Sequence, residues 1–345
     1  MILALETSCD DTCAAVLGED GRALSNVISS QRAHERFGGV VPEIASRHHL
    51  ESVNAIVDRA LQEAEASLAD MDLIAATRGP GLVGALLVGL STGKSLAAAR
   101  GLPFAAIDHL QGHVAANFLV DGQPGTGSFE PPFVCLIASG GHTLLVRVER
   151  HDGFEVLGRT LDDAAGEAFD KGARMLGLGY PGGAALEALA AGGDPRAFLF
   201  PGSPGERARG TGRKPFATGL DFSFAGLKTA LLYVVREMPE QQLRERAADL
   251  AASYQAAIVE SLLVRTQRAL ERTGLDRLAV GGGVAANGEL RRRLAELDVT
   301  LHVPARSLCT DNAAMIASAA RYVPARAYPE YLGTEAYATG EGPLR

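Results

Sequence analysis

The sequence predicts an α/β protein made of two related lobes, and three observations lead to this fold class. First, a chain of 345 residues is longer than a single hydrophobic core usually supports. Second, a strand–turn–strand–turn–strand pattern begins at residue 2 and again at residue 133. Third, helical and strand patterns alternate between the two copies. A duplication of this kind is typical of two similar lobes rather than of a solenoid.

Each copy of the repeated unit contains one strong hairpin signal. In the first copy, ILALETS, TCAAVLG and ALSNVIS are separated by CDD and by the Asp20-Gly21 turn. In the second copy, FVCLIAS, TLLVRVER and FEVLGRT are separated by GGH and by the Asp152-Gly153 turn. An Asp-Gly pair between alternating apolar runs favours a hairpin, so we expect one at each of these turns.

Between the copies we expect helices and strands in alternation. Pro42 opens a periodic helical run that extends to about Ala69. Residues 72–79 have the pattern of a strand, residues 83–100 that of a buried helix, and residues 103–107 that of a further strand. The GLSTGKS segment resembles a phosphate-binding P-loop, but its glycines are one residue too close together. We therefore interpret Lys94 as a helix residue.

After the second copy the sequence predicts more helix than strand. One helix follows Asp162 and Asp163, which we interpret as its caps, and stops at Gly177. A long helix extends from about Glu240 to Thr273, followed by a strand over 275–280 and a glycine turn that enters another helix. Three further segments carry no regular pattern: by composition, 123–132 and 201–219 are loops, and the final residues form a loose tail.

Composition narrows the class of protein. An apolar fraction of 47% and a charged fraction of 21% are those of an ordinary soluble globular protein. The most apolar stretch, LVGALLVGLSTGKSL, is interrupted by glycines and a lysine, so we expect no membrane span and no membrane partner. The N-terminus lacks the basic region of a signal peptide, and four irregularly spaced cysteines form no disulfide framework. We therefore expect a cytoplasmic protein.

The net charge of −8 argues against nonspecific attraction of the protein to nucleic acid but not against docking of nucleic acid on local basic patches.

A histidine pair suggests a metal site. His109 and His113 lie four residues apart, so on a helix their side chains share one face, and Asp108 is a suitable N-cap for that helix. The metalloprotease signature requires Glu after the first histidine, where this chain has Leu110. Asp311 is a candidate third ligand. Its local context also fits a helix N-cap, and the two histidines could simply belong to a surface helix.

Glycine-rich turns suggest a phosphate-bearing ligand. SGGHT (139–143) and GGGVAAN (281–287) each follow a buried strand, where glycine lets a phosphate approach the backbone closely. The acidic helix in DDAAGEAFDK is either a solvated surface helix or places Asp170 or Glu167 where it can bind ribose hydroxyls.

These segments resemble, in order, the motifs of the universal tRNA threonylcarbamoyltransferase family, whose bacterial member is called TsaD. Its older description is O-sialoglycoprotein endopeptidase. The motifs are ETSCDD, RGPGLVGALLVG, HLQGH, LIASGGHTLL, DDAAGEAFDK, GYPGG, DFSFAGLKTA, GGGVAAN and CTDNAAMIA, and they extend over residues 2 to about 322. The resemblance implies two ribonuclease-H-like lobes of the actin-like, sugar-kinase and Hsp70 ATPase superfamily.

The resemblance also implies a reaction and its partners. Threonylcarbamoyl-AMP donates its threonylcarbamoyl group to N6 of adenosine 37 in tRNAs that read codons beginning with A, and AMP leaves. The implied partners are the tRNA, a TsaB-like paralogue that docks on helices of the first lobe, and a TsaE-like P-loop ATPase. The implied cofactors are one divalent metal, with iron favoured and zinc as the alternative, and a nucleotide in the cleft: threonylcarbamoyl-AMP, ATP or AMP.

The family's functional residues carry over onto matching positions. The implied metal ligands are His109, His113 and Asp311. The implied substrate contacts are Ile137, Ala138, Ser139, Gly140, Gly141, Asp170, Gly183, Glu187 and Asn287. The chain departs from the usual pattern at two positions: Gln111 stands where Glu is usual, and Glu187 where Asp is often found.

We expect a first lobe of residues 1–107 plus about 312–330, a second lobe of 108–311 with the metal and nucleotide cleft, and the loose tail at 331–345. Asp10 or Asp11 is a candidate acceptor for the proton that leaves the adenosine amine. The alternative functions are a metallopeptidase, invited by the histidine pair, and an ATPase or nucleotide-binding module without transferase activity.

Overall fold

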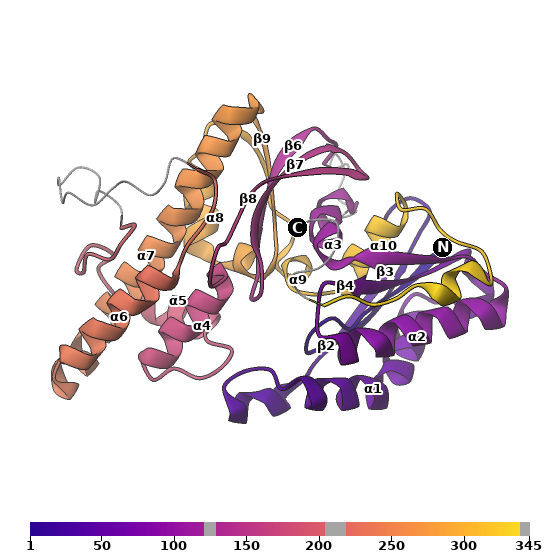
Figure 1. Ribbon diagram of the computed structural model, residues 1–345, viewed down its shortest axis with the longest axis horizontal. Coiled ribbons are helices and arrows are strands. Elements are labelled where there is room, and N and C mark those ends of the chain that lie inside the picture. Colours follow the sequence, from indigo (N-terminus) through magenta and orange to yellow (C-terminus); the bar gives the residue numbers. More distant parts are fainter. Residues whose placement is uncertain (121–128, 204–218, 339–345) are drawn as a thin grey trace. The chain divides into compact units, whose positions relative to one another are not determined.

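The computed structural model describes residues 1–120, 129–203 and 219–338 (Figure 1). The chain divides into two compact units. Unit 1 comprises residues 1–131, 148–154 and 304–345, and unit 2 comprises residues 132–147 and 155–303. Most of the two predicted loops, at 123–132 and 201–219, lies outside the described residues.

A five-stranded mixed sheet forms the centre of unit 1, in the order β3-β2-β1-β4-β5. β1 pairs antiparallel with β2 on one side and parallel with β4 on the other. The strands are β1 (Ile2–Glu6), β2 (Asp11–Leu17), β3 (Ala23–Ser30), β4 (Leu73–Gly79) and β5 (Phe104–Asp108). β1, β2 and β4 are almost wholly buried, which is why they read as continuous apolar runs rather than as alternating ones.

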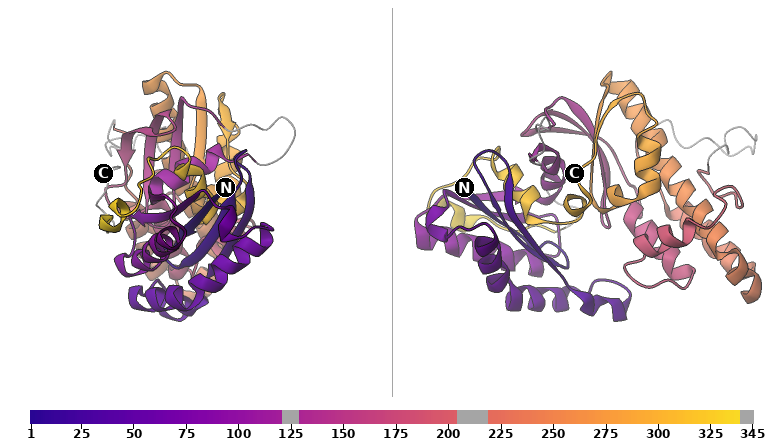
Figure 2. Two further views of the ribbon diagram at one scale, coloured as in Figure 1. Left: turned by 90° about the vertical axis from the view of Figure 1, so that its right-hand side faces the viewer. Right: turned by 180° about the vertical axis from the view of Figure 1, so that it is seen from behind.

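Helices cover both faces of this sheet, as Figures 1 and 2 show. α1 and α2 pack together and against the strands on one face, whereas α10 packs on the other face and also contacts α3. The helices of unit 1 are α1 (Pro42–Glu63), α2 (Val83–Arg100), α3 (His109–Ala115), α9 (Arg306–Cys309) and α10 (Ala313–Ala320). Short 3-10 helices occur at η1 (Arg32–Phe37), η2 (Leu68–Asp70), η3 (Ala116–Phe118) and η6 (Glu330–Gly333).

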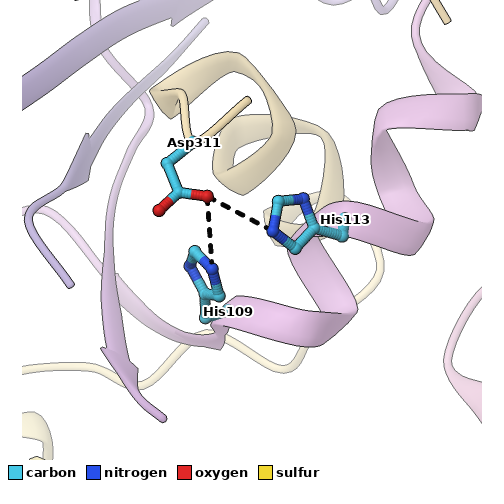
Figure 3. A group of neighbouring side chains, drawn as sticks. All are labelled: His109, His113 and Asp311. Carbon is cyan, nitrogen blue, oxygen red and sulfur yellow. Dashed lines mark ion pairs between the residues drawn. The ribbon is translucent and has the colours of Figure 1, made fainter. Parts of the chain in front are cut away.

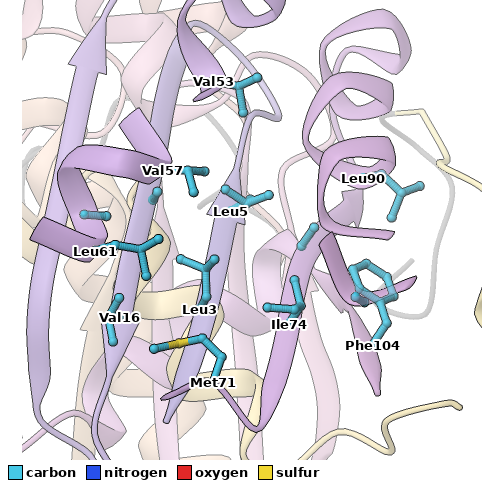
Figure 4. Packing of buried hydrophobic residues seen from close by; sticks show 14 of the residues in the cluster. Leu3, Leu5, Val16, Val53, Val57, Leu61, Met71, Ile74, Leu90 and Phe104 are labelled. Atoms are coloured by element: carbon cyan, nitrogen blue, oxygen red, sulfur yellow. The ribbon is translucent and has the colours of Figure 1, made fainter. Parts of the chain in front are cut away.

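A hydrophobic core joins the α1–α2 layer to this sheet (Figure 4). Leu3 and Leu5 of β1 meet Val57 and Leu61 of α1, and Phe104 of β5 completes the cluster beside α2. Full burial of such a side chain contributes about 1.5–3 kcal/mol. The core therefore fixes the strand ends from which the turns of the candidate site leave.

Unit 2 repeats the topology of unit 1. Its sheet has the order β10-β9-β6-β7-β8, which is the order of the first sheet with β6 in the place of β1. β9 pairs parallel with β6 and with β10, as β4 pairs parallel with β1 and β5. The strands are β6 (Phe133–Ala138), β7 (Thr143–Arg150), β8 (Gly153–Arg159), β9 (Arg277–Gly281) and β10 (Thr300–His302). The predicted duplication is confirmed.

The helices of unit 2 form a connected layer around α7. They are α4 (Ala165–Met175), α5 (Gly183–Ala190), α6 (Ala225–Glu237), α7 (Glu240–Thr273) and α8 (Gly288–Leu294), with the 3-10 helix η5 at Gly283–Ala286. Gly274 ends α7 in the left-handed conformation, as the sequence predicted. α7 is also the one described helix long and apolar enough to cross a membrane, but 72% of its most apolar window is buried within the protein.

Two predictions about helix ends were wrong. α1 stops at Glu63 rather than near Ala69, because Glu65 adopts a positive φ of 52° and Ser67 then caps the short helix η2. Asp162 and Asp163 do not cap α4. Asp162 instead accepts hydrogen bonds from the backbone amides at the start of α6, and Asp163 forms ion pairs with lysines of α4 and α6.

The predicted lobe boundaries also differ from the observed units. Of the described residues, 108–120, 129–131 and 304–311 belong to unit 1, where α3 packs against α10. The predicted metal ligands therefore all lie in unit 1. The predicted loose tail is ordered over 331–338: Tyr331 is fully buried and packs against Phe104. Residues 339–345 lie outside the described part of the chain.

Candidate functional site

The two histidines lie on the short helix that follows β5. The Asp108 carboxylate accepts hydrogen bonds from the amides of Leu110 and Gln111, at 2.8 and 3.0 Å, so the predicted N-cap is confirmed. His109 and His113 are both buried, and their ring centroids are 4.6 Å apart. The four-residue spacing therefore places two imidazoles on one face of α3, turned toward the interior of unit 1.

Asp311 meets both imidazoles (Figure 3). Its Oδ1 atom lies 3.5 Å from Nε2 of His109 and 3.3 Å from Nε2 of His113. The alternative interpretation of Asp311 as a helix cap is wrong, because Asn312 caps α10 by accepting a hydrogen bond from the Met315 amide. The expected convergence of residues about two hundred positions apart is observed.

The chemistry of this cluster fits a divalent transition metal. One ligand atom from each of the three residues lies within 4.8 Å of the other two. Two ligands at about 2.1 Å from a tetrahedral metal are roughly 3.4 Å apart, close to the observed nitrogen–oxygen distances. Among the described residues, neither ring nitrogen of the buried His113 has a hydrogen-bond partner. A buried polar atom without a hydrogen-bond partner lowers the stability of the fold. A cation bound to Nε2 of His113 would provide a partner for that atom.

Glu6 is a candidate site residue that was not predicted from the sequence. It is fully buried at the end of β1, and its Oε2 atom accepts hydrogen bonds from Thr77, at 2.6 Å, and from Nδ1 of His109, at 3.0 Å. A carboxylate on Nδ1 fixes the tautomer and orientation of a metal-binding imidazole and leaves Nε2 for the metal. The sequence did contain a signal for Glu6: it is a carboxylate at the end of an otherwise apolar strand, ILALE.

The charges of this cluster are strongly coupled. Burial opposes ionisation of Glu6, yet the neighbouring His109 lowers the pKa of this carboxyl group overall. Burial likewise opposes protonation of His109, but Asp311 and Glu6 together raise the pKa of this imidazole to about 9. In the metal-free protein, a proton on His109 therefore balances the buried carboxylates near neutral pH.

Asp10 and Asp11 lie at the turn between β1 and β2, with Asp11 as the first residue of β2. The carbonyl of Asp10 accepts a hydrogen bond from the Gln31 amide at 3.1 Å, which holds this turn against the end of β3. Burial, together with the nearby carboxylates of Asp311 and Asp10, raises the pKa of Asp11 to about 7. Asp11 thus belongs to the same electrostatic environment as the metal-ligand cluster.

In unit 2, two glycine-rich turns lie side by side where parallel strands end. Ile137 and Ala138 end β6, and Ile137 pairs in register with Gly281, the last residue of β9. Gly282 adopts a positive φ of 87°, and a Cβ atom there would lie 2.4 Å from the carbonyl oxygen of Ala138. Only glycine fits this close approach. Ligands of open α/β sheets bind at this edge, outside the carboxyl ends of the strands.

The SGG turn after β6 presents open backbone. Gly140 and Gly141 are exposed, and no atom lies within 4 Å of where a Cβ atom would stand on either residue. Ser139 closes the turn through a 2.8 Å hydrogen bond from its amide to the His142 carbonyl. Gly166 of α4 packs directly on the turn, where a Cβ atom would come within 2.6 Å of the Ser139 carbonyl oxygen. The start of α4 therefore supports the turn by close backbone contact.

The other predicted substrate contacts of unit 2 make hydrogen bonds within that unit. Asp170 Oδ1 accepts hydrogen bonds from the amides of Gly182 and Gly183, at 2.8 and 3.2 Å. Glu187 accepts one from the Gly288 amide at 2.8 Å, next to Asn287. Asn287 caps α8 through Oδ1 and donates from Nδ2 to Gln255. Asp170, Glu187 and Asn287 thus hold the local backbone in place.

The chain matches known proteins along most of its length. The family model described as "TsaD: tRNA N6-adenosine threonylcarbamoyltransferase" matches residues 22–318. A tRNA N6-adenosine threonylcarbamoyltransferase of Syntrophobacter fumaroxidans is 51% identical over 330 residues, which cover 93% of this chain and 93% of that protein. The protein of the same name from Pelobacter propionicus is 49% identical over 324 residues, covering 92% and 90% of the two chains.

Solved structures of low sequence identity confirm the predicted fold. HypF of T. kodakarensis aligns with a TM-score of 0.58 at 13% identity, over 93% of this chain and 47% of that one. Component A of the Acidaminococcus fermentans (R)-2-hydroxyglutaryl-CoA dehydratase aligns with a TM-score of 0.51 at 15% identity, over 96% and 97%. Together with the duplicated sheets, these likenesses show the predicted α/β fold of two ribonuclease-H-like units.

The first prediction concerns Glu6. In Glu6→Gln, Nδ1 of His109 keeps a neutral hydrogen-bond partner but loses the charge that aligns the imidazole. We expect the affinity for Fe²⁺ or Zn²⁺ to fall about 10- to 100-fold, as measured by competition with a chelator. The matched control is Glu43→Gln, at an exposed position of α1 in the same unit. Equal affinities of the Glu6→Gln variant and the wild type would exclude the proposed role of Glu6.

The second prediction concerns pH. Because the pKa of His109 is about 9 in the metal-free protein, a metal must displace a proton from Nε2 at neutral pH. Metal affinity should therefore rise about tenfold per pH unit from pH 7 and level off near pH 9. Titration calorimetry in two buffers of different ionisation enthalpy should detect release of about one proton per metal at pH 7. Binding at pH 7 without proton release would contradict the charge assignment.

The third prediction tests the glycine turn. In Gly166→Ala, the added methyl group would displace the Ser139–Gly140 backbone, so we expect AMP affinity to fall about tenfold, or roughly 1.4 kcal/mol. The matched control is Gly226→Ala, because Gly226 is also the second residue of its helix and has nothing within 4 Å of its Cβ position. Equal losses in both variants would indicate a general effect on helix packing instead.

Proposed function

The chain belongs to the TsaD family of tRNA N6-adenosine threonylcarbamoyltransferases, and we propose that it modifies adenosine 37 of tRNAs that read codons beginning with A. In this reaction N6 of the adenosine bonds to the carbamoyl carbon of threonylcarbamoyl-AMP. The bond from that carbon to the phosphate oxygen breaks, N6 loses a proton, and AMP leaves. The observation that best supports this proposal is the contact of Asp311 with His109 and His113, in a chain that is 49–51% identical to transferases of this name.

A divalent metal would be held by His109, His113 and Asp311. Two histidines and one carboxylate with coordination positions left open are typical of non-haem iron(II), which supports iron over zinc, although zinc accepts the same ligands. When bound, the metal supplies a Lewis acid that can bind an oxygen of the threonylcarbamoyl group. Glu6 keeps a proton on Nδ1 of His109, so that Nε2 faces the metal position.

The nucleotide part of the substrate would contact unit 2. The open backbone of Gly140 and Gly141 can approach phosphate oxygens, and the adjoining 281–283 turn extends this surface. Asp170 and Asn287 hold nearby backbone in place through hydrogen bonds to its amides. We assign the ribose contact to Asp170. The remaining members of the proposed substrate-binding set are Ile137, Ala138, Ser139, Gly183 and Glu187.

Asp11 is the better candidate for the proton acceptor than Asp10. A general base is most effective when its pKa lies near the working pH, and the pKa of Asp11 is about 7. This value follows from burial and from the neighbouring carboxylates. A cation bound nearby would lower it, which would keep Asp11 in the basic form at neutral pH.

The proposed partners are the tRNA, a TsaB-like paralogue and a TsaE-like P-loop ATPase, acting in the cytoplasm. Three large apolar side chains stand exposed on the α1–α2 layer of unit 1: Leu50, which is 70% exposed, Val83 and Leu87. Val83 and Leu87 lie one turn apart on α2, and α2 packs against α1, which carries Leu50. An exposed apolar surface on such a layer is suited to bind another protein. We therefore expect the paralogue to dock on this layer.

The observations do not favour the alternative functions. A peptidase of the two-histidine type needs a Glu as general base after the first histidine, and this chain has the buried Leu110 there. ATPases of this fold bind magnesium mainly through carboxylates and phosphate, whereas this cluster supplies two imidazoles.

The direct test is tRNA modification. Purified chain, supplied with threonylcarbamoyl-AMP, unmodified tRNA and its partner proteins, should form threonylcarbamoyladenosine, detected by mass spectrometry of the digested tRNA. His109→Ala and His113→Ala should reduce the rate by more than about 100-fold, beyond the cost of losing an outer-shell partner. The exposed His48 supplies the matched control for metal content, His48→Ala, which is measured without the partner proteins because α1 belongs to the proposed docking layer. Wild-type chain that releases AMP but leaves the tRNA unmodified would overturn the proposal.

The fourth prediction distinguishes the two aspartates. The pKa of Asp11 is about 7 without metal, and the bound cation lowers it. The single-turnover rate of the metal-loaded enzyme should therefore fall in an acidic limb whose midpoint lies below pH 7, because protonated Asp11 cannot accept the N6 proton. Asp11→Asn should be slower by about 100-fold or more and lose this acidic limb of the pH profile. Asp10→Asn should keep the limb. An unchanged rate in Asp11→Asn would remove Asp11 from the mechanism.

A further inference from the structure

The C-terminal segment, residues 326–338, is bound along the edge of the first sheet. Arg326 and Phe104 of β5 exchange both backbone hydrogen bonds at 2.9 Å. Tyr331 is fully buried, with its ring 5.6 Å from that of Phe104. Lys94 of α2 donates hydrogen bonds to the carbonyls of Leu332 and Thr334. Three kinds of contact thus hold this segment against unit 1: backbone hydrogen bonds, aromatic packing and hydrogen bonds from a charged lysine.

The segment ends beside the turn that follows β4. The Tyr337 amide donates a 3.0 Å hydrogen bond to the Arg78 carbonyl, and the Arg78 guanidinium lies 5.1 Å from the centre of the Tyr337 ring. Gly79 allows this approach: its φ is +148°, and a Cβ atom there would lie 2.4 Å from the Tyr337 carbonyl oxygen. Ala338 then forms a parallel bridge with Gly81. Tyr337 is consequently fixed on both its backbone and its ring.

Tyr337 connects this segment to the histidine-bearing helix. Its phenol donates a hydrogen bond to Oδ2 of Asp108, while Oδ1 of the same carboxylate accepts from the first amides of α3. Asp108 is only 5% exposed, and the phenol of Tyr337 supplies the hydrogen bond to its Oδ2 atom. His109 directly follows this cap and His113 lies one turn further. A rotation of the Asp108 carboxylate would therefore shift the first turn of α3 and the Nε2 atom of His109.

We propose that Tyr337 is a positioning residue that, with the C-terminal segment, holds the Asp108 cap and so sets the geometry of the metal-binding helix. This inference rests on the proposed metal site, because it assigns Tyr337 a role in preorganising the ligands. A carboxylate bound on both oxygens has one orientation, whereas a carboxylate bound on Oδ1 alone can rotate. Loss of the phenol hydroxyl should loosen the cap without removing the ring that packs under Arg78.

The test compares Tyr337→Phe with Tyr328→Phe, a matched control at a 61% exposed tyrosine of the same segment. In metal-free protein, hydrogen exchange of the α3 amides should become about three- to tenfold faster in Tyr337→Phe and stay unchanged in Tyr328→Phe. Affinity for Fe²⁺ or Zn²⁺, measured by competition with a chelator, should fall about tenfold in Tyr337→Phe alone.

The outcomes separate this inference from the function it rests on. Unchanged α3 exchange in Tyr337→Phe overturns the positioning role, whether or not the wild type binds metal. Faster α3 exchange with unchanged metal affinity also overturns it, because the cap would then not set the ligand geometry. Failure of the wild type to bind either metal would reject the metal site itself, and the exchange experiment would still report on the cap.

Discussion

Two buried carboxylates that share one histidine are the constraint on which the candidate site depends. Glu6 is fully buried and Asp311 is half-buried, and the carboxylate of each forms an ion pair with His109. Buried charges are stable only when paired. In the metal-free protein the pair is a protonated imidazole, with a pKa of about 9, and a divalent cation can replace that proton. The cluster therefore requires positive charge. Nε2 of His113, which makes no hydrogen bond and lies 3.3 Å from Oδ1 of Asp311, is placed to bind a metal ion that supplies this charge.

The proposed function assigns different chemistry to the corresponding turns of the two units, which share one topology. In each unit the central strand of the sheet ends in a turn to the next strand. After β1 this turn bears acidic side chains, and Glu6, Asp10 and Asp11 gather there. After β6 the corresponding turn is Ser139–Gly141, open backbone without bulky side chains. Carboxylates are suited to bind a cation and exposed backbone amides to bind a phosphate, so the corresponding turns of the two units are suited to ligands of opposite charge.

Features set by neighbouring residues could be predicted from the sequence, and those set by distant contacts could not. Hairpins at Asp-Gly turns, α2, and α7 with its stop at Gly274 were correct because period and capping are local signals. Asp162 was assigned to the wrong helix, because its partners at the start of α6 come about sixty residues later. The role of Glu6 and the order of residues 331–338 depend on His109, Phe104 and Lys94. From its local context Asp311 was a candidate third ligand, but a helix cap explained the same context, and the family resemblance then favoured the metal ligand.

The most direct measurement of the central claim is elemental analysis of the purified protein beside its Asp311→Asn variant. This substitution keeps the shape of the side chain but removes the carboxylate that faces both imidazoles. We predict about one iron or zinc per wild-type chain and a large loss of metal in Asp311→Asn. Wild-type protein without either metal after loading, or an Asp311→Asn variant that retains a full complement, would contradict the three-ligand site.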